Sequence, residues 1–337
     1  LVPLSLSPRT KQPIRIKEFV KRKNMGTLVG HVAPGFGFFV IGLWHLLNHI
    51  KLHAINPNSY KSLPWFPTSR LKYTELFLIM AGSSMSVAME LFIGPNRHQP
   101  FDPDGTIPSY HLRNFEHSNI SMTFFVYAAF ALILDRVGPK AQHGLTQLLG
   151  ALAFSQQLLL FHLHSTDHMG VEGQYHWLLQ LVIFVSLLTT LMGIGNPKSF
   201  LISFVRSLSI SFQGVWLMVM GVMLWTPEFI PKDCYMNLED GHQVVRCRGA
   251  ESLERAKSLV NIEFSWYLIG VTIFAMLLYL ALIKFYGEKD EYESLAKFED
   301  HEEETDEDVE AQKKSKVNES KSFIYLGKGS ASMDMER

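Results

Sequence analysis

Cysteine is scarce in this sequence: only two of the 337 residues are cysteines. The chain has no HExxH motif and no paired CxxC motifs, which excludes the sequence signatures of common zinc sites. No basic patch with interleaved aromatic residues is present, so nothing predicts a nucleic-acid partner. No internal repeat has a clear period, which argues against a solenoid or propeller. The net charge of −1 says little about partners, because the apolar centre and the polar ends differ so much in composition.

Long apolar runs dominate the centre of the chain instead. Runs of roughly 18 or more apolar residues with few charges are candidate membrane spans. Each span must be helical, because only a helix satisfies its own backbone in lipid. We predict an all-α, polytopic membrane protein whose seven-transmembrane-helix bundle occupies residues 25–286 of the sequence and is embedded in the lipid bilayer. The predicted spans are 27–50, 73–95, 112–135, 144–166, 173–194, 200–225 and 261–285.

The two ends of the chain are polar. Residue 1 is Leu rather than Met, and the basic stretch "RTKQPIRIKEFVKRKN" lacks the apolar core of a signal peptide. We interpret Met25 as the native start and residues 1–24 as a non-native or disordered basic extension; a genuine basic arm is the alternative. Residues 287–337 are acidic and then mixed polar, which predicts a disordered cytosolic tail. This tail either binds cytosolic trafficking factors or is a solvated end.

The cysteines indicate an orientation. We call the side of the membrane at Met25 side A and the opposite side side B. The loop 227–260 lies on side A and contains Cys234 and Cys247. Their spacing suits a disulfide, which persists in an oxidising compartment; two free thiols are the alternative. Side A is therefore predicted to face the lumen or the exterior, in the endomembrane system (Golgi or related) or the plasma membrane. The positive-inside bias agrees, because one loop on side B carries Lys51, Lys61, Arg70 and Lys72.

Polar residues occur at a common depth near side A. Six of the seven predicted helices bring such a residue about one turn inside that boundary. Ionisable groups in a span are costly and normally face the bundle interior, so a shared polar chamber is expected. The residues concerned are His31, Glu90, Glu116, His117, His162, His164, Asp167, His168, His176, Asn261 and Glu263. Helical spacing adds Ser121, Gln157 and Gln213 to the stripes that would line this chamber.

Imidazoles with a carboxylate suit zinc or another divalent metal. A metal-bound water would need a proton acceptor, for which Glu116, Asp167 and Glu172 are candidates. A purely hydrogen-bonded network, a haem site and a proton relay are the alternatives. The predicted metal ligands are His31, Glu90, His117, His162, His164, His168 and His176.

A second set of histidines lies at the side B end of the first span. In "WHLLNHIKLH", His45, His49 and His53 are spaced four apart and share one face. We interpret this stripe as an interfacial face rather than a ligand set.

Several segments together resemble the transmembrane protein 45 family, defined by domain of unknown function 716. They include "GHVAPGFGFFVIGLWHL", "NFEHSNISMTFFVYAAFA", "LLLFHLHSTDHMGVEGQYHWLLQLV" and "SISFQGVWL". "HSTDHMG", "RCRGAESLERAKSLVN" and "FSWY" are similar to the plant branch. The resemblance covers roughly residues 25–285. It implies a multi-pass endomembrane protein without an established reaction, and it fits the family pattern at His31, His117, His162, His164 and Gln213.

Three functions follow as hypotheses. The leading one is a metal-dependent hydrolase acting on a lipid or other membrane substrate. The second is a transporter or channel that uses the same chamber as an ion or proton site, with a path to side B through Arg206 and the histidines of the first helix. A sealed apolar half at side B would argue against it. The third is a trafficking or scaffold protein whose polar network only holds the helices together.

Overall fold

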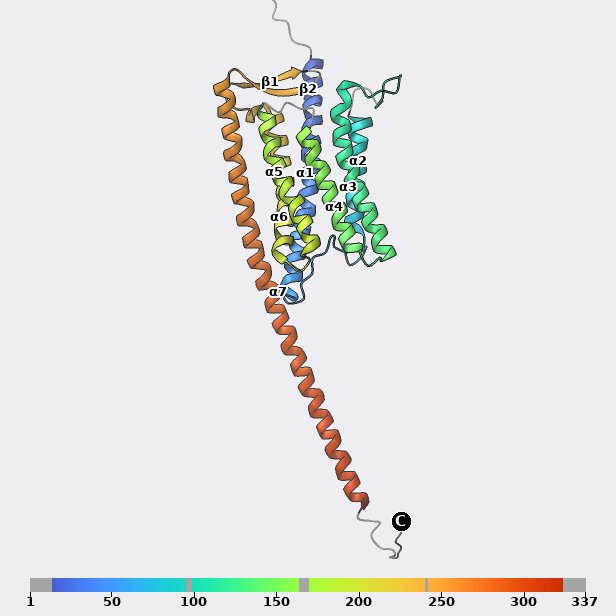
Figure 1. The fold of residues 1–337 in the computed structure, drawn as a ribbon. Helices are drawn as coiled ribbons and strands as arrows, with labels where there is room; N and C mark the ends of the chain where they lie inside the picture. The colour runs from blue at the N-terminus through green and yellow to red at the C-terminus, as the bar shows by residue number, and fades with distance from the viewer. Residues whose placement is uncertain (1–13, 95–98, 164–169, 240–241, 324–337) are drawn as a thin grey trace, which may run out of the picture. The chain divides into compact units, whose positions relative to one another are not determined.

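Seven helices in the described part of the chain are long and apolar enough to cross a membrane, as the sequence predicts (Figure 1). The computed structural model describes the secondary structure of residues 14–94, 99–163, 170–239 and 242–323. The helices are α1 (Ile14–Ile55), α2 (Thr74–Ala88), α3 (Leu112–Val137), α4 (Gln142–Leu163), α5 (Val171–Gly195), α6 (Phe200–Trp225) and α7 (Ala250–Phe323). Short turns of helix are η1 (Met89–Ile93), η2 (Ser109–His111) and η3 (Pro227–Phe229).

The apolar parts of these helices match the predicted spans closely, with one exception. The last span was predicted to begin at residue 261, whereas α7 begins at Ala250. The stretch "AESLERAKSLV" is rich in Ala, Leu, Glu, Arg and Lys, which favour a helix even where the sequence is too polar for a span. The connection between α6 and α7 is therefore shorter than the predicted loop 227–260, because the last residues of that range are helical.

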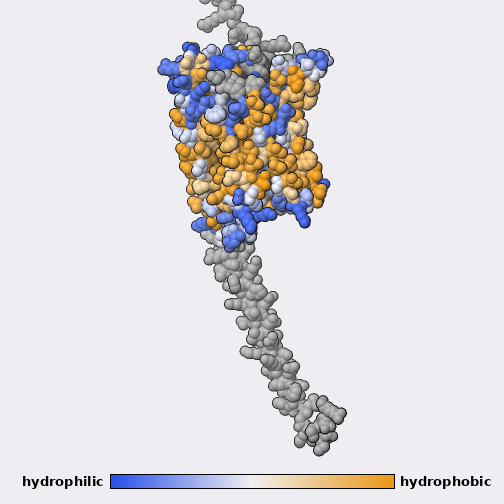
Figure 2. All heavy atoms as spheres, in the orientation of Figure 1, coloured by the Kyte–Doolittle hydropathy of each residue, from blue (hydrophilic) through white to orange (hydrophobic). Residues whose placement is uncertain are grey.

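The outer surface of the bundle carries a belt of apolar side chains (Figure 2). Large apolar residues on this surface include Phe77, Phe130, Phe184 and Leu277, each about half exposed or more. Polar residues gather at both ends of the belt. Water does not favour so much exposed apolar area, so the belt is the surface that lipid tails contact.

Helix α6 is the most buried of the membrane spans. Its Trp216 and Met220 are fully buried and pack with Leu179 and Ile183 of α5. The indole nitrogen of Trp216 donates a hydrogen bond of 3.1 Å to the carbonyl oxygen of Tyr175. The indole N–H is the one polar group of this side chain, and its apolar surroundings would otherwise leave it without a hydrogen-bond partner.

Glycines allow α1 and α6 to pack with their backbones almost in contact. A Cβ atom on Gly42 would lie 2.2 Å from the backbone nitrogen of Ser211, and one on Gly214 would lie 2.2 Å from that of Phe39. Real Cβ atoms do not approach backbone so closely, so only glycine fits at these two positions. Small residues are the usual means by which membrane helices reach such close contact. The α1–α6 pair consequently fixes the side chains that both helices present to the interior.

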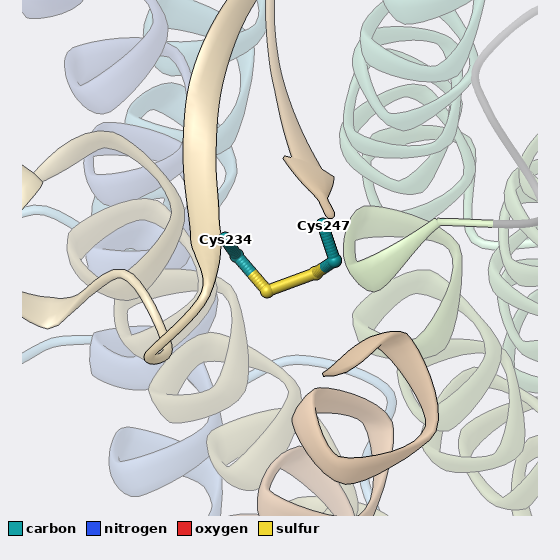
Figure 3. The surroundings of a disulfide bond; sticks show 2 residues. All are labelled: Cys234 and Cys247. Carbon is teal, nitrogen blue, oxygen red and sulfur yellow. A yellow bond between two sulfur atoms is a disulfide. The ribbon is translucent and has the colours of Figure 1, made fainter. Parts of the chain in front are cut away.

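A β-hairpin forms part of the connection from α6 to α7 on side A. Its strands β1 (Cys234–Glu239) and β2 (His242–Cys247) are antiparallel, with Cys234 opposite Cys247 in register. The structure joins these two cysteines in a disulfide, which closes the hairpin at its base (Figure 3). The pairing Arg246–Glu239, with Asn237 donating to the same carboxylate at 2.8 Å, ties the two strands together near the turn. A hydrogen bond from Arg246 lowers the pKa of Glu239 from 4.5 to about 2.

The chain divides into two compact units, residues 1–280 and 281–337. The second unit is helical to Phe323, where the sequence predicted a disordered tail, and α1 starts at Ile14 within the predicted extension 1–24. Both segments are rich in Glu, Lys and other good helix formers, and local propensity does not require a buried core.

Candidate functional site

Glu90, one of the residues of the predicted chamber, lies in the π-helical turn η1 at the end of α2. The Nδ2 atom of Asn114 on α3 donates to Glu90 Oε2 at 2.8 Å, and His117 Nδ1 lies 3.2 Å from Glu90 Oε1. A π-helical turn widens the helix locally and is frequent at functional sites. Here it presents the carboxylate to two polar side chains of the neighbouring helix.

His31 and His176 continue this set across the bundle. The ring of His31 on α1 packs on Trp225 with centroids 4.4 Å apart, and its centroid is 6.3 Å from that of His176 on α5. His31 is also close enough to Glu90 to interact with it electrostatically. The ring nitrogen Nδ1 of His176 bonds the carbonyl oxygen of Glu172 at 3.0 Å, which makes Nδ1 the protonated nitrogen. Four of the predicted residues therefore form a row from α3 to α5.

The other predicted chamber residues pair with neighbouring helices and do not join this row. His162 Nδ1 contacts Gln180 at 3.2 Å, and Gln174 donates to Asn261 at 2.7 Å. Gln213 donates to Gln157 at 3.1 Å, with both side chains buried in the middle of the bundle. Two further pairs are Ser121 with Ser86 at 2.8 Å and Tyr175 with Glu263 at 2.7 Å.

The structure does not assemble a metal shell from the residues that it describes. Among them, no group of three or more His, Cys, Asp or Glu side chains is arranged to hold a metal ion. Glu116 is partly exposed and Glu172 is buried. His164, Asp167 and His168 lie outside the described residues. The zinc site and its proton acceptor therefore stay predictions.

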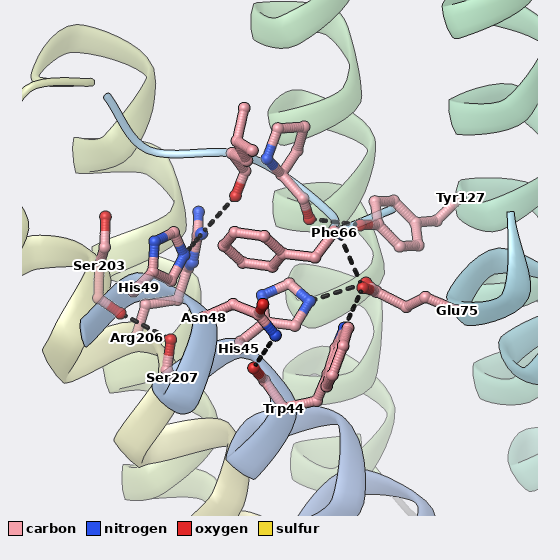
Figure 4. A network of polar contacts seen from close by, with 12 residues as sticks. Trp44, His45, Asn48, His49, Phe66, Glu75, Tyr127, Ser203, Arg206 and Ser207 are labelled. Carbon is pink, nitrogen blue, oxygen red and sulfur yellow. Dashed lines mark hydrogen bonds and ion pairs between the residues drawn. The ribbon is translucent and has the colours of Figure 1, made fainter. Parts of the chain in front are cut away.

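A second polar cluster lies near side B and centres on Glu75, a residue that the sequence analysis did not name (Figure 4). This residue is in the first turn of α2 and is 3% exposed. Its carboxylate accepts three hydrogen bonds, from Trp44 Nε1 at 3.0 Å, His45 Nε2 at 2.7 Å and the backbone nitrogen of Phe66 at 2.8 Å. These three donors satisfy the oxygens of an acidic side chain that its buried position would otherwise leave unpaired.

Arg206 on α6 supplies a buried positive charge to the same cluster. Its guanidinium donates to Gln147 Oε1 at 2.7 Å, to the carbonyl oxygen of Leu63 at 3.1 Å and to His49 Nε2 at 3.2 Å. Arg206 is 4% exposed. The hydrogen bonds of Arg206 and those of Glu75 go to different partners, and the rings of His45, His49 and Phe66 lie between them.

The connection between α1 and α2 completes the cluster by folding into the end of the bundle. Tyr60, Ser62, Trp65 and Phe66 of this connection are all buried. The Ser62 nitrogen donates to the Pro197 carbonyl at 2.7 Å. The Tyr127 hydroxyl on α3 donates to the Pro64 carbonyl at 3.0 Å. We call residues 60–66 the plug, because they are held between Glu75 on one side and Arg206 on the other.

The plug overturns the interpretation of the side B histidines as an interfacial face. His45 is 5% exposed and His49 is fully buried, because the plug covers them. His53, one turn further out, stacks on Phe200 with centroids 4.1 Å apart. The available signal was that Glu75 and Arg206 are isolated charges at the ends of apolar spans, where each requires buried partners. Sequence reasoning placed Arg206 on a possible path to side B but missed Glu75.

Tyr60 links the plug directly to His49. Its hydroxyl lies 2.8 Å from His49 Nδ1. Burial raises the pKa of Tyr60 above its ordinary value, so this hydroxyl stays protonated at neutral pH. It can therefore accept a hydrogen bond from His49 and donate one elsewhere.

Residues 143–280 match a family of unknown function, DUF716. The matched segment contains nearly all of α4, the whole of α5 and α6, and the first part of α7, including Gln147 and Arg206. Glu75, His45 and His49 lie before it.

Proposed function

We propose that this chain is a membrane transport protein that conducts protons between side A and side B. The observation that supports this function is the buried cluster of Glu75, Arg206, His45 and His49. Ionisable residues inside a span are costly and mark ion pathways and proton relays. A scaffold would need no charges at this position, because apolar packing holds helices more cheaply.

The buried polar cluster near side B supports a transporter, because an entirely apolar side B half would have argued against one. The buried pair Gln157–Gln213 lies midway along α4 and α6, and the row at Glu90 lies near side A. Polar groups consequently occur at three depths of one bundle. Hydroxyls, amides and imidazoles of this kind support a proton chain when water joins them.

Proton conduction is tested with the full chain purified and reconstituted in liposomes. A potassium gradient with valinomycin sets the membrane potential, and a trapped dye reports internal pH. Wild-type vesicles should change pH faster than empty vesicles, and Glu75→Gln should slow them. Glu263→Gln is the matched control, because it makes the same chemical change at the Tyr175 contact on α7. Wild-type vesicles no faster than empty ones would contradict the function.

The finer identity of the chain is also a proposal. The match to DUF716, together with the segments quoted above from residues before it, supports membership of the transmembrane protein 45 family and its plant branch. The disulfide supports a lumenal or exterior side A, hence a cytosolic side B and an endomembrane or plasma-membrane location. The acidic tail is then positioned to bind cytosolic trafficking factors. Labelling of the single thiol of Cys234→Ser, from either side of sealed membranes, tests this orientation.

A further inference from the structure

We infer that His45 is the residue that takes up and releases the conducted proton, while His49 is held neutral. This inference rests on the proposed function and names the residue through which the side B cluster works. The two imidazoles are on the same face of α1, with ring centroids 6.0 Å apart. His49 faces the Arg206 guanidinium, which only donates hydrogen bonds, whereas His45 faces the Glu75 carboxylate, which accepts them. This difference decides which of the two rings can bind a further proton.

Both ring nitrogens of His49 already have hydrogen-bond partners, so neither can bind a further proton without breaking a bond. Its Nε2 lies 3.2 Å from the Arg206 guanidinium, which has only donors, so Nε2 must be the accepting nitrogen. Its Nδ1 therefore carries the hydrogen and donates to the Tyr60 oxygen at 2.8 Å. A second proton on His49 would break the bond to Arg206 and place two buried cations in contact, which the low dielectric of the bundle makes very unfavourable.

His45 has the reverse arrangement. Its Nε2 faces the Glu75 carboxylate at 2.7 Å, so Nε2 carries the hydrogen and donates. Its Nδ1 is buried and has no hydrogen-bond partner among the residues that the structure describes. The neutral ring therefore offers an unused lone pair. A proton can add at Nδ1 without breaking the bond to Glu75, and the carboxylate balances the new charge.

The proton balance of the step is simple. A hydronium ion gives its proton to Nδ1 and becomes water, so an N–H bond forms there. The N–H bond at Nε2 then breaks as its proton passes to Glu75 Oε1, which leaves a neutral ring with its hydrogen on Nδ1 and a protonated carboxyl group. Glu75 then loses this proton to a water molecule on the far side, so one proton has entered and one has left. Rotation of the ring must then turn the Nδ1–H group toward Glu75 before the next proton binds at the bare Nε2.

The groups around His45 favour this assignment. The charged and titratable side chains of the cluster are Glu75 from α2, His49 from α1, Arg206 from α6 and Tyr60 from the plug, with Tyr127 of α3 bonded to the plug backbone. Among the described residues, Glu75 is the acidic side chain in contact with His45. The Phe66 ring contacts both imidazoles, with centroids 5.4 Å from His45 and 4.7 Å from His49, so an apolar ring borders the two histidines.

The experiment compares His45→Gln, His49→Gln and His143→Gln in the liposome assay and follows the protonation of the His45 and His49 rings in the wild-type protein. His45→Gln should lower proton flux by about a hundredfold, the size of effect typical for loss of one proton-transfer group. His49→Gln should lower the flux less than His45→Gln does. His143→Gln is the matched control, because it makes the same chemical change at a histidine of α4 outside the cluster, and it should leave the flux unchanged. Nitrogen-15 NMR of the wild type in detergent should show a proton binding at His45 Nδ1 as acid is added, while the His49 ring stays in its neutral form.

The two proposals fail separately. If the wild type conducts protons but His49→Gln abolishes the flux and His45→Gln does not, the assignment to His45 is wrong and proton conduction stands. If His45 gains a proton by NMR but wild-type vesicles do not conduct, conduction is wrong and the proton site stands. If His45→Gln does not fold, the NMR measurement on the wild type decides alone, and an unchanged His45 ring overturns the inference.

Discussion

His49 Nε2 accepts a hydrogen bond of 3.2 Å from Arg206, so one of the two buried basic residues must remain uncharged. Arginine is effectively always protonated, and the neutral partner is therefore the histidine. This relationship divides the side B cluster into a fixed positive end at Arg206 and a negative end at Glu75, with a movable proton at His45 near the negative end.

Replacement of Glu75 tests the negative end through stability as well as flux. In Glu75→Gln, the amide keeps one accepting oxygen but directs its NH₂ group toward donors. With three donors around it, the variant should lose about 1–3 kcal/mol of stability, the usual effect of leaving a buried polar group unsatisfied. Thermal melting in detergent measures this loss. Melting equal to that of the wild type would show that these hydrogen bonds do not hold the plug.

The glycine contact between α1 and α6 gives a prediction that is independent of function. Gly42→Ala and Gly214→Ala should each destabilise the bundle by about 1–3 kcal/mol or more, because the added methyl group meets backbone of the other helix. Gly37→Ala is the control on α1, since a Cβ there meets nothing within 4 Å. Size-exclusion and melting experiments compare the three variants. Equal behaviour of all three would contradict the close packing.

The disulfide should be required for a stable hairpin. Cys234 and Cys247 are separated by 13 positions, and closing a loop of that size restricts the unfolded chain by about 3 kcal/mol. Cys234→Ser should lower stability by up to that amount and expose one reactive thiol at Cys247. Labelling with a maleimide, before and after reduction, checks the pairing. Labelling of the unreduced wild type would show two free thiols.

The hairpin should also respond to acid through Glu239. Its pKa is lowered to about 2 in the folded state by Arg246, so the pairing stabilises the hairpin above the ordinary carboxyl pKa. That contribution is lost as pH falls through about 2. The effect is small because the pair is solvent-exposed. Carboxyl NMR titration should show Glu239 returning to an ordinary pKa in Arg246→Ala; an unchanged midpoint would contradict the role of Arg246.

Zinc near side A remains a separate prediction of the sequence. If the row at His117 and Glu90 belongs to a metal site, protein purified without added metal should contain zinc. His117→Ala should then lower the zinc content, and His162→Ala, whose ring contacts Gln180 instead, should change it less. Elemental analysis measures both. No zinc in the wild type would leave the row as a hydrogen-bonded network.

The seven helices were predictable because an apolar run long enough to cross lipid has few alternatives to a helix. Helix direction and rise fix the depth of a residue, and the structure brings Glu90 to His117 and His31 to His176. The partner of each residue was not predictable, because rotation of a helix about its axis depends on packing. Gln213 pairs with Gln157 in mid-bundle, and Asn261 pairs with Gln174 on α5.

The side B cluster was missed for a different physical reason. Polar loop segments are expected at the surface, and the stretch "NPNSYKSLPWFPTSR" has the composition of such a segment. Its aromatic residues Tyr60, Trp65 and Phe66 are the part that favours burial, and Glu75 and Arg206 supply the hydrogen bonds that its backbone needs. A hydropathy value averaged over a window conceals both the aromatic residues of the plug and the buried charges. The two isolated charges in apolar spans were the sign of this cluster that the sequence offered.

The most direct test of proton conduction is the reversal potential of the reconstituted protein across a planar bilayer with a pH gradient. If protons carry the current, the reversal potential should shift by about 59 mV for each unit of pH difference, the Nernst factor for a single charge. Glu75→Gln should remove this current and Glu263→Gln should preserve it. A wild-type current that is absent, or that ignores the pH gradient, would contradict proton conduction by this protein.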